Sequence, residues 1–324
     1  MRAIRLHNRK EVLYESDVPI PSLGPNDVLL RIHATAVIAP ELTWPETHTT
    51  RSGTPRPFPI PGHDLSGTIA ALGTSIPSSF PYKIGDEVFA LTAFSRDGAE
   101  AEYAIALPAE IAPKPQTLNH IQAAAVPLSA LTAWQALFDH AGLDPLDHGR
   151  NVGKRVLITG AAGGVGIFAV QLAHWAGIHV IGTASTRNVD FIRSLGADEA
   201  IDYTTVSFAD TIRNADIVFD CVGGDTLARC WDVVKQDGGV LISVAQPASL
   251  EVAKQHPGVK RVWPIVSPNG EQLGQIRQLV DKGMIRPEVE TVMRLEDANK
   301  AFELGGKGHT RGKIVLEVLE ELPD

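Results

Sequence analysis

The segment TGAAGGVG, residues 159–166, constrains the fold of this chain more than any other feature. It follows the continuous apolar run RVLIT at 155–159, which is typical of a parallel strand buried on both faces. After it, apolar residues recur at helical spacing from Val165 to Ala176, and Gly177 closes the predicted helix. The chain must therefore turn sharply off a buried strand and enter a helix packed closely on the sheet.

The residue types in this turn are those of a dinucleotide-binding loop. Three fingerprint positions are occupied by Ala161, Gly163 and Gly166, with Ala in place of the first Gly. Small residues let the backbone approach a pyrophosphate, and the N–H groups at the start of the helix face its charge. We therefore predict that six consecutive residues bind the cofactor: Ala161, Ala162, Gly163, Gly164, Val165 and Gly166. A glycine-rich turn without a ligand is the alternative, but the strand before it and the helix after it are the context that the motif requires.

The end of the next predicted strand, 179–183, indicates which dinucleotide is bound. In NAD enzymes an acidic residue at that point binds the ribose hydroxyls. Here Ser185, Thr186 and Arg187 follow the strand, and the first carboxylate is Asp190. Two hydroxyls and a guanidinium suit a 2′-phosphate, which a carboxylate would repel. We predict NADPH as the cofactor; the alternative is that Arg187 only faces solvent.

The rest of the chain divides into two kinds of pattern. Apolar runs at 217–220, 240–244 and 259–266 alternate with helical segments, which predicts a doubly wound parallel sheet. Before residue 122, short strands are separated by Pro and Gly turns, which is typical of a β-rich barrel or sandwich. A helix at 271–282 and a last strand at 313–318 are also expected. A chain of 324 residues fits two such domains.

Composition excludes several classes of function. The chain has 38 acidic against 29 basic residues and a net charge of −9, which disfavours nucleic-acid binding. No stretch reaches the roughly 18 apolar residues of a membrane span, and the first residues lack the apolar core of a signal peptide. Two cysteines allow no disulfide framework. We expect a cytoplasmic protein that acts on a small molecule.

A series of further segments resembles one enzyme superfamily. They are PFPIPGHDLSGTIAALG (57–73), KIGDEVFAL (83–91), AAAVPLSALTAWQAL (123–137), VLITGAAGGVGIFAVQLA (156–173), LGADEAIDY (195–203), FDCVGG (219–224) and HTRGKIVL (309–316). In this order they resemble the medium-chain dehydrogenase/reductase superfamily, in its zinc-free quinone oxidoreductase and enoyl reductase branch.

The resemblance implies an α/β chain of two domains. A GroES-like β-rich barrel domain is expected from 1–122 with 268–324, and a Rossmann NADPH-binding domain with a doubly wound parallel sheet from 123–267. It further implies that substrate and nicotinamide meet between the domains. A homodimer is expected through the sheet edge at 259–266.

The resemblance also assigns further cofactor contacts. Ser185, Arg187 and Tyr203 resemble an adenosine-phosphate pocket, Cys221, Val222, Val244 and Ala245 resemble backbone contacts to the nicotinamide side, and Arg311 resembles a residue that reaches the cofactor from the C-terminal segment. The alternatives are a surface aromatic at Tyr203 and an ordinary loop cation at Arg311. Cys221 is expected to contribute its backbone rather than thiol chemistry.

The chain departs from the zinc-dependent relatives at their ligand positions. Those relatives have a Cys in the segment matching 36–42, a His-Glu pair, and another Cys or Asp after the Ala-rich helix start. Here 36–42 has no soft ligand, Leu128 and Ser129 supply none, and His63 and Asp64 stand alone. Catalytic zinc needs three protein ligands, so we predict no metal and a structural or wall position for His63.

Without a Lewis acid, acceptors that are already electrophilic are the easier substrates. We expect hydride transfer from NADPH to a quinone or an α,β-unsaturated carbonyl, with the protein positioning the reactants and stabilising the developing oxyanion. The alternatives are a zinc-free alcohol or aldehyde oxidoreductase and a non-catalytic NADPH-binding redox sensor.

The proton donor is an open question at this stage. Some enoyl reductases use a Tyr in the region matching 44–51, and this region has none here. His48 could donate the proton near neutral pH, and Trp44 could wall the pocket. Alternatively, both line a surface loop and no dedicated donor is needed.

Overall fold

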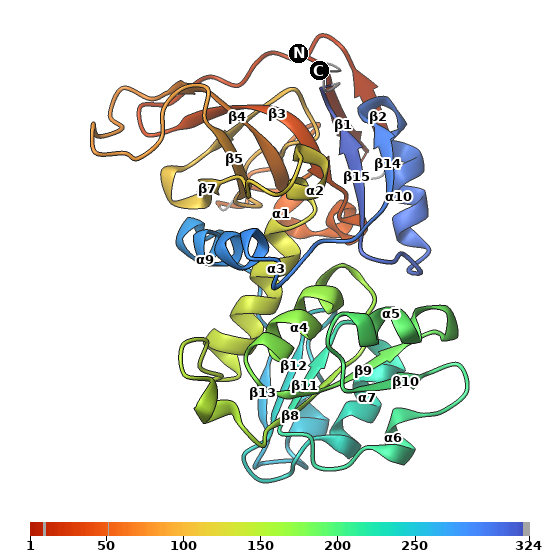
Figure 1. The fold of residues 1–324 in the computed structure, drawn as a ribbon. Coiled ribbons are helices and arrows are strands. Elements are labelled where there is room, and N and C mark those ends of the chain that lie inside the picture. The colour runs from red at the N-terminus through yellow and green to blue at the C-terminus, as the bar shows by residue number, and fades with distance from the viewer. Residues whose placement is uncertain (9–10, 51, 320–324) are drawn as a thin grey trace. The chain divides into compact units, whose positions relative to one another are not determined.

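The computed structural model describes residues 1–8, 11–50 and 52–319. It divides into two units (Figure 1). The first unit comprises Met1–Leu131, Ser267–Gly283 and Pro287–Asp324, and the second comprises Thr132–Val266 and Met284–Arg286. The domain limits expected from the sequence, 1–122 with 268–324 and 123–267, stay predictions. Among the described residues, no helix has the length and apolar character needed to cross a membrane.

The second unit is built on a six-stranded parallel sheet in the order β10-β9-β8-β11-β12-β13. Its strands are β8 (Arg155–Ile158), β9 (His179–Ala184), β10 (Glu199–Asp202), β11 (Ile217–Asp220), β12 (Val240–Ser243) and β13 (Lys260–Val262). Its helices are α4 (Gly164–Trp175), α5 (Val189–Ser194), α6 (Phe208–Thr211), α7 (Gly224–Val233) and α8 (Leu250–Ala253). In this order the half-sheets β10-β9-β8 and β11-β12-β13 meet between β8 and β11. This arrangement confirms the doubly wound Rossmann prediction.

Continuous burial explains why these short runs form parallel strands. In β8, Val156, Leu157 and Ile158 are fully buried, as a strand covered on both faces requires. The core around β8 continues through Ile181, Val218 and Leu241 on the neighbouring strands. The strand expected at 259–266 is shorter, because only Lys260–Val262 pairs with β12.

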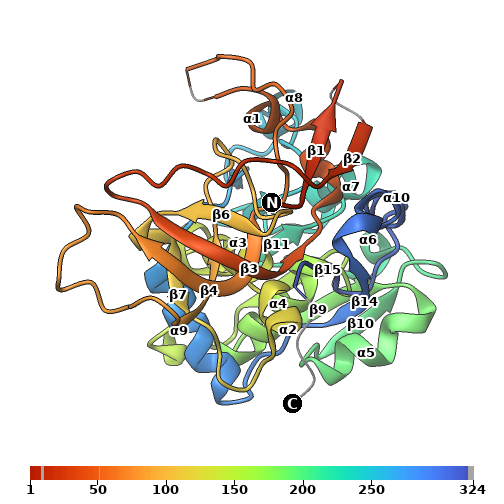
Figure 2. The ribbon, with the colours of Figure 1, turned by 90° about the horizontal axis from the view of Figure 1, so that it is seen from above.

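The first unit contains a mostly antiparallel seven-stranded sheet in the order β14-β15-β3-β4-β5-β7, with β6 paired to β3 (Figure 2). The bounds are β3 (Val28–Ala36), β4 (Asp64–Leu72), β5 (Glu87–Leu91), β6 (Tyr103–Ala106), β7 (Ile111–Pro113), β14 (Val289–Arg294) and β15 (Lys313–Glu317). A separate hairpin joins β1 (Ala3–His7) to β2 (Glu11–Glu15). The helices are α1 (Pro45–His48), α2 (His120–Ala124), α3 (Pro127–Trp134, which runs into the second unit), α9 (Gly270–Asp281) and α10 (Ala298–Gly306). This β-rich unit, with a C-terminal strand inserted beside β3, confirms the GroES-like expectation.

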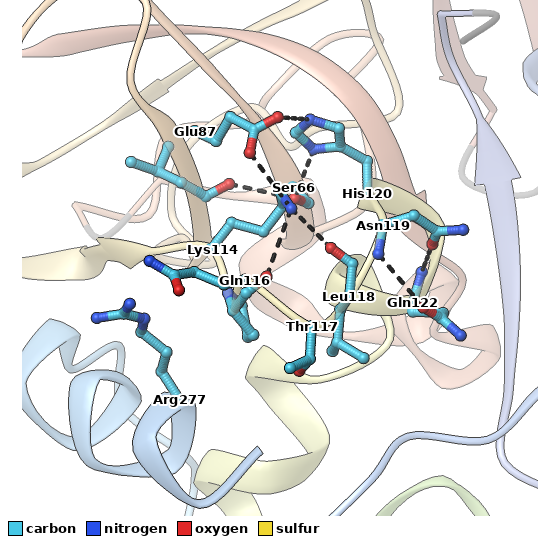
Figure 3. A network of polar contacts seen from close by, with 12 residues as sticks. Ser66, Glu87, Lys114, Gln116, Thr117, Leu118, Asn119, His120, Gln122 and Arg277 are labelled. Atoms are coloured by element: carbon cyan, nitrogen blue, oxygen red, sulfur yellow. Dashed lines mark hydrogen bonds and ion pairs between the residues drawn. The ribbon is translucent and has the colours of Figure 1, made fainter. Parts of the chain in front are cut away.

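A polar network ties helix α2 to the sheet of the first unit (Figure 3). The ring of His120 lies between two partners: its Nδ1 is 2.8 Å from the Ser66 hydroxyl and its Nε2 is 3.1 Å from a Glu87 carboxylate oxygen. Lys114 approaches the other oxygen of Glu87 at 3.3 Å. Burial, then the nearby charge of His33, lowers the pKa of His120 to about 4. The ring is therefore neutral near pH 7, with Nε2–H donating to Glu87 and Nδ1 accepting from Ser66.

A second buried group, the acid pair Glu41 and Glu100, lies in the same unit. Both residues are fully buried, and Gly62 N–H donates to one oxygen of Glu41 at 2.8 Å. Neither oxygen of Glu100 has a hydrogen-bond partner, and neither does the second oxygen of Glu41. Burial, and then the charge of Glu41, raises the pKa of Glu100 well above its ordinary value. The interior therefore favours a protonated Glu100.

The network around His120 predicts a loss of stability in mild acid. The unfolded histidine binds a proton below about pH 6.5, whereas the folded one stays neutral until about pH 4, so this group costs about 2–3 kcal/mol of unfolding free energy across that window. His120→Gln cannot take up that proton and should show a shallower loss between pH 6.5 and pH 4 in urea unfolding. His179→Gln, which removes an exposed histidine 2.7 Å from Glu199, should keep the wild-type profile. Parallel profiles for wild type and His120→Gln would contradict the assignment.

The acid pair predicts the opposite dependence for Glu100. Because its folded pKa is raised, folding retains a proton there, and stability falls as the pH rises from about 4.5 towards the folded pKa. Glu100→Gln keeps the shape without an ionisable group and should raise the unfolding free energy at pH 8 by about 1–2 kcal/mol, with no gain at pH 4. Its control is Glu102→Gln, which breaks a pair with Arg2 at 2.8 Å and should lower stability slightly. Equal effects of Glu100→Gln at both pH values would rule out a retained proton.

Candidate cofactor-binding site

The loop between β8 and α4 has the geometry that its glycines predict. Gly160 adopts a φ of +62°, in the region that favours glycine. A Cβ added at Gly166 would lie 2.3 Å from the carbonyl oxygen of Gly160, so a side chain there would push the helix off the strand. The structure therefore places Ala161, Ala162 and Gly163 in a tight strand-to-helix turn and Gly164, Val165 and Gly166 in the first turn of α4.

Helix α4 begins at this loop without a side-chain cap. Gly163 is the N-cap residue, with extended backbone angles, and no side chain accepts from the first turn of this 12-residue helix. The N–H groups at a helix start carry a partial positive charge that suits a phosphate. A glycine-lined turn with uncapped donors fits the pyrophosphate of a dinucleotide.

The residues predicted for the adenosine end lie together at the same edge of the sheet. Ser185 and Arg187 directly follow β9, and Tyr203 directly follows β10. The two strand ends are joined by a hydrogen bond from Tyr203 N–H to the carbonyl of Ala184 at 3.1 Å. Tyr203 is 51% exposed, so its ring is available to a ligand.

A carboxylate that the linear sequence did not reveal stands beside this group. Asp202, the last residue of β10, accepts a hydrogen bond from the Thr186 hydroxyl at 2.6 Å and one from the Thr204 hydroxyl at 2.6 Å. These bonds, Thr186 first, lower the pKa of Asp202. The sequence after β9 does not show this carboxylate, because it comes from the neighbouring strand. The Thr186 hydroxyl is thus committed to Asp202 in this structure.

The residues predicted for the nicotinamide end follow the next two strands. Cys221 and Val222 come after β11, and Val244 and Ala245 come after β12. A Cβ on Gly160 would lie 3.1 Å from Val222 Cγ2, so the β11 loop touches the glycine loop. Burial, and then the charge of Asp220, raises the pKa of the Cys221 thiol well above its ordinary value. A protonated thiol is a poor nucleophile, which agrees with a backbone role.

Arg311 lies in the turn before β15 in the first unit. Its guanidinium is 2.9 Å from Glu288, and its backbone N–H donates to Glu290. The structure thus gives Arg311 two local acidic partners, and its contact with the cofactor stays a prediction.

Trp44 immediately precedes helix α1, and His48 is the last residue of that helix. The Trp44 ring packs edge-on against Phe94 with ring centres 5.1 Å apart. His48 is buried, and its Nε2 lies 2.8 Å from the carbonyl oxygen of Leu42, which can only accept. Nε2–H is therefore the donor in that bond, and Nδ1 could donate a proton only when the ring is an imidazolium. Of the region 44–51, Arg51 lies outside the described residues.

The contacts of His63 and Asp64 show whether these side chains are placed to bind a metal ion. His63 has Thr92 Oγ1 at 3.1 Å from Nδ1 and Glu41 at 3.2 Å from Nε2. Asp64 is paired with Lys313 at 3.1 Å and accepts from the Leu128 N–H. Within residues 1–8, 11–50 and 52–319, no three His, Cys, Asp or Glu side chains are placed to hold a metal ion.

Two family models and several known proteins match this chain. An alcohol dehydrogenase GroES-like domain model matches residues 24–116, and a zinc-binding dehydrogenase model matches residues 195–316. A protein of Arthroderma benhamiae named "Probable zinc-binding oxidoreductase, mitochondrial" is 42% identical, over 93% of this chain and 91% of its own. The "Chloroplast envelope quinone oxidoreductase homolog" of Arabidopsis thaliana is 33% identical, over 93% and 92%.

The fold comparison gives the same result. The quinone oxidoreductase of Coxiella burnetii superposes with a TM-score of 0.86 at 32% identity, covering 98% of this chain and 99% of the other. The chain is therefore an oxidoreductase that belongs to the medium-chain dehydrogenase/reductase superfamily, in its quinone oxidoreductase-like branch.

Proposed function

We propose that the protein reduces a quinone or an α,β-unsaturated carbonyl with hydride from NADPH and without a metal ion. The observation that carries the proposal is the turn at 159–166, where the approach of Gly166 to the Gly160 carbonyl leaves no room for side chains. The names of the quinone oxidoreductase relatives support the acceptor class. NADPH would supply the hydride when bound, and the chain would bind and orient it.

Five of the six strand ends of the second unit would have a part in that binding. The turn Ala161–Gly166 and the start of α4 would hold the pyrophosphate, Ser185 and Arg187 the 2′-phosphate, and Tyr203 the adenosine. The backbone at Cys221, Val222, Val244 and Ala245 would orient the nicotinamide. This assignment is supported by all five loops, those after β8, β9, β10, β11 and β12, leaving the carboxyl edge of one parallel sheet.

Protonation of the reduced acceptor is proposed to come from water. This choice is supported by the bond from His48 Nε2–H to the Leu42 carbonyl oxygen, which occupies one of the two ring nitrogens. A metal-free reaction is supported by His63 and Asp64, whose side chains are engaged with Thr92, Glu41 and Lys313. Acceptors that need no Lewis acid fit such a site.

The reaction is tested by following NADPH oxidation, with NADH in parallel, against quinones, straight-chain enones and a simple aldehyde, with and without a chelator. We expect turnover of the quinones or enones that prefers NADPH and is insensitive to the chelator. Activity on the aldehyde that the chelator abolishes would favour a metal-dependent alcohol or aldehyde oxidoreductase. Tight NADPH binding without turnover of any acceptor would favour the redox sensor.

The preference for NADPH rests on two opposing charges, Arg187 and Asp202. Arg187→Ala should weaken NADPH binding roughly 10- to 150-fold, the value of a charged hydrogen bond of about 1.5–3 kcal/mol, and leave NADH binding nearly unchanged. Asp202→Asn removes a carboxylate that repels the phosphate and should tighten NADPH binding several-fold. Fluorescence titration with both cofactors measures these effects.

The control for that pair is Arg193→Ala on helix α5. Arg193 is also exposed and pairs with Asp190 at 3.1 Å, so its loss removes the same charge from the same region. Unchanged NADPH affinity in Arg187→Ala, or an equal loss in Arg193→Ala, would remove Arg187 from the phosphate pocket.

We also propose a homodimer formed through the edge strand β13. The proposal is supported by Trp263 and Ile265, which are 49% and 62% exposed just beyond that strand. Edge strands with apolar neighbours favour pairing with a second chain. Sedimentation of the full chain would give twice 34.7 kDa for the dimer and 34.7 kDa for a monomer.

A cytoplasmic location is likewise proposed. It is supported by Cys221 and Cys230, which are both free thiols, as a reducing compartment would keep them. The relative from Arthroderma benhamiae is named as mitochondrial, so imaging of the tagged chain has to separate the two compartments.

A further inference from the structure

The carboxylate of Asp220 is the most heavily bonded acidic group at the carboxyl edge of the second unit's sheet, and the proposed function leaves it without a role. It is the last residue of β11 and is fully buried. Its Oδ1 accepts from the Thr159 hydroxyl at 2.7 Å, and its Oδ2 accepts from the Ser243 hydroxyl at 2.7 Å. One residue thus reaches the ends of both neighbouring strands, β8 and β12.

Asp220 also holds the loop that follows it. The N–H of Val222 donates to Oδ1 at 3.2 Å, and the N–H of Gly223 donates to Oδ2 at 3.0 Å. Gly223 has a φ of +79°, so the loop turns through a conformation that other residues rarely adopt. The two hydrogen bonds to the Asp220 carboxylate hold that turn in place.

The hydroxyl groups of Thr159 and Ser243 extend the hydrogen-bond network to further backbone groups. Because each gives its hydrogen to Asp220, its oxygen is left to accept. Thr159 Oγ1 accepts from the Cys221 N–H at 3.1 Å, and Ser243 Oγ accepts from the Gln246 N–H at 3.4 Å. The network therefore joins the glycine loop, the β11 loop and the β12 loop through one buried charge.

The three loops also touch one another above this network. A Cβ on Gly223 would lie 3.2 Å from Ala245 Cβ, just as a Cβ on Gly160 would lie 3.1 Å from Val222. The three loops therefore lie close together. Since burying a carboxylate is costly unless it is fully hydrogen-bonded, the donors around Asp220 also hold these strand ends in one arrangement.

We infer that Asp220 is a positioning residue that sets the relative arrangement of the three loops assigned to the pyrophosphate and the nicotinamide. The inference rests on the proposed cofactor site. Asp220 acts through Thr159, Ser243 and the Val222–Gly223 backbone, without touching the cofactor itself.

The same strand supplies a matched control. Asp216 precedes β11 at the opposite edge of the sheet, where it accepts from the Arg155 N–H at 3.0 Å and pairs with Lys235 at 3.3 Å. Asp216→Asn removes a partly buried carboxylate that lies just before the same strand, at the end away from the loops. Its loss costs stability without touching the cofactor edge.

The test compares Asp220→Asn and Asp216→Asn in NADPH titrations and in amide hydrogen exchange of the ligand-free protein. We expect Asp220→Asn to weaken NADPH binding by about tenfold or more, as the loss of charged hydrogen bonds implies, and Asp216→Asn to stay within about twofold of wild type. The Val222 and Gly223 amides should exchange faster only in Asp220→Asn. Thr159→Ser, which keeps the hydroxyl, should bind like wild type, whereas Thr159→Val should follow Asp220→Asn.

Each result separates this inference from the proposed function. If wild type binds neither NADPH nor NADH, the proposed function fails, and the amide exchange rates still decide whether Asp220 holds the loops. If wild type binds NADPH and Asp220→Asn binds it equally well, the positioning role is overturned. Equal losses in Asp220→Asn and Asp216→Asn would show a general effect on stability and would overturn it as well.

Discussion

The close approach of helix α4 to the end of β8 is the constraint on which the second unit depends. Only hydrogen at Gly166 lets the helix pass the Gly160 carbonyl, where a Cβ would come to 2.3 Å. That contact sets the direction of α4, and with it the direction of the N–H groups that open towards the carboxyl edge of the sheet. A larger residue at this point would have to displace backbone rather than a flexible side chain, which is why the glycine loop could be recognised from the sequence.

The fold was predictable where burial is continuous or strictly periodic. The strands β8, β9, β11 and β12 were expected within one residue at each end, because runs such as Val156–Ile158 are apolar on both faces of the strand. Strand β14 and helix α10 were not expected. In β14 the residues VETVMR alternate between half-buried and exposed, so the strand shows no strong apolar signal and is held by its pairing with β15. Its position depends on a partner that the local sequence does not specify.

The loops of the candidate site could be predicted from the sequence, but the contacts of its acidic residues could not. The glycines of 159–166 and the residues after β9 and β11 show themselves in the sequence, since each lies in a recognisable strand-to-turn pattern. Asp202 and Asp220 also end strands, but nothing in the sequence says which neighbours their carboxylates meet. Strand order decides this: β10 lies beside β9, and β11 lies between β8 and β12. Glu41 and Glu100 were missed for the same reason, because only the folded first unit brings two glutamates from distant segments into its interior.

The buried acids Asp220 and Glu100 differ in the hydrogen-bond donors that surround their carboxyl groups. Asp220 is met by two hydroxyls and two backbone N–H groups, so its oxygens are fully used. Glu100 is met by no donor at all and lies near another acid, so the interior favours its proton. A chain of net charge −9 that binds an anionic cofactor cannot rely on its overall field for attraction. Under the proposed function it would supply positive potential locally, through oriented backbone N–H groups and single guanidinium groups such as Arg187. A buried acid that fixes the direction of those N–H groups is compatible with anion binding, because its own charge is already satisfied beneath the loops that it positions.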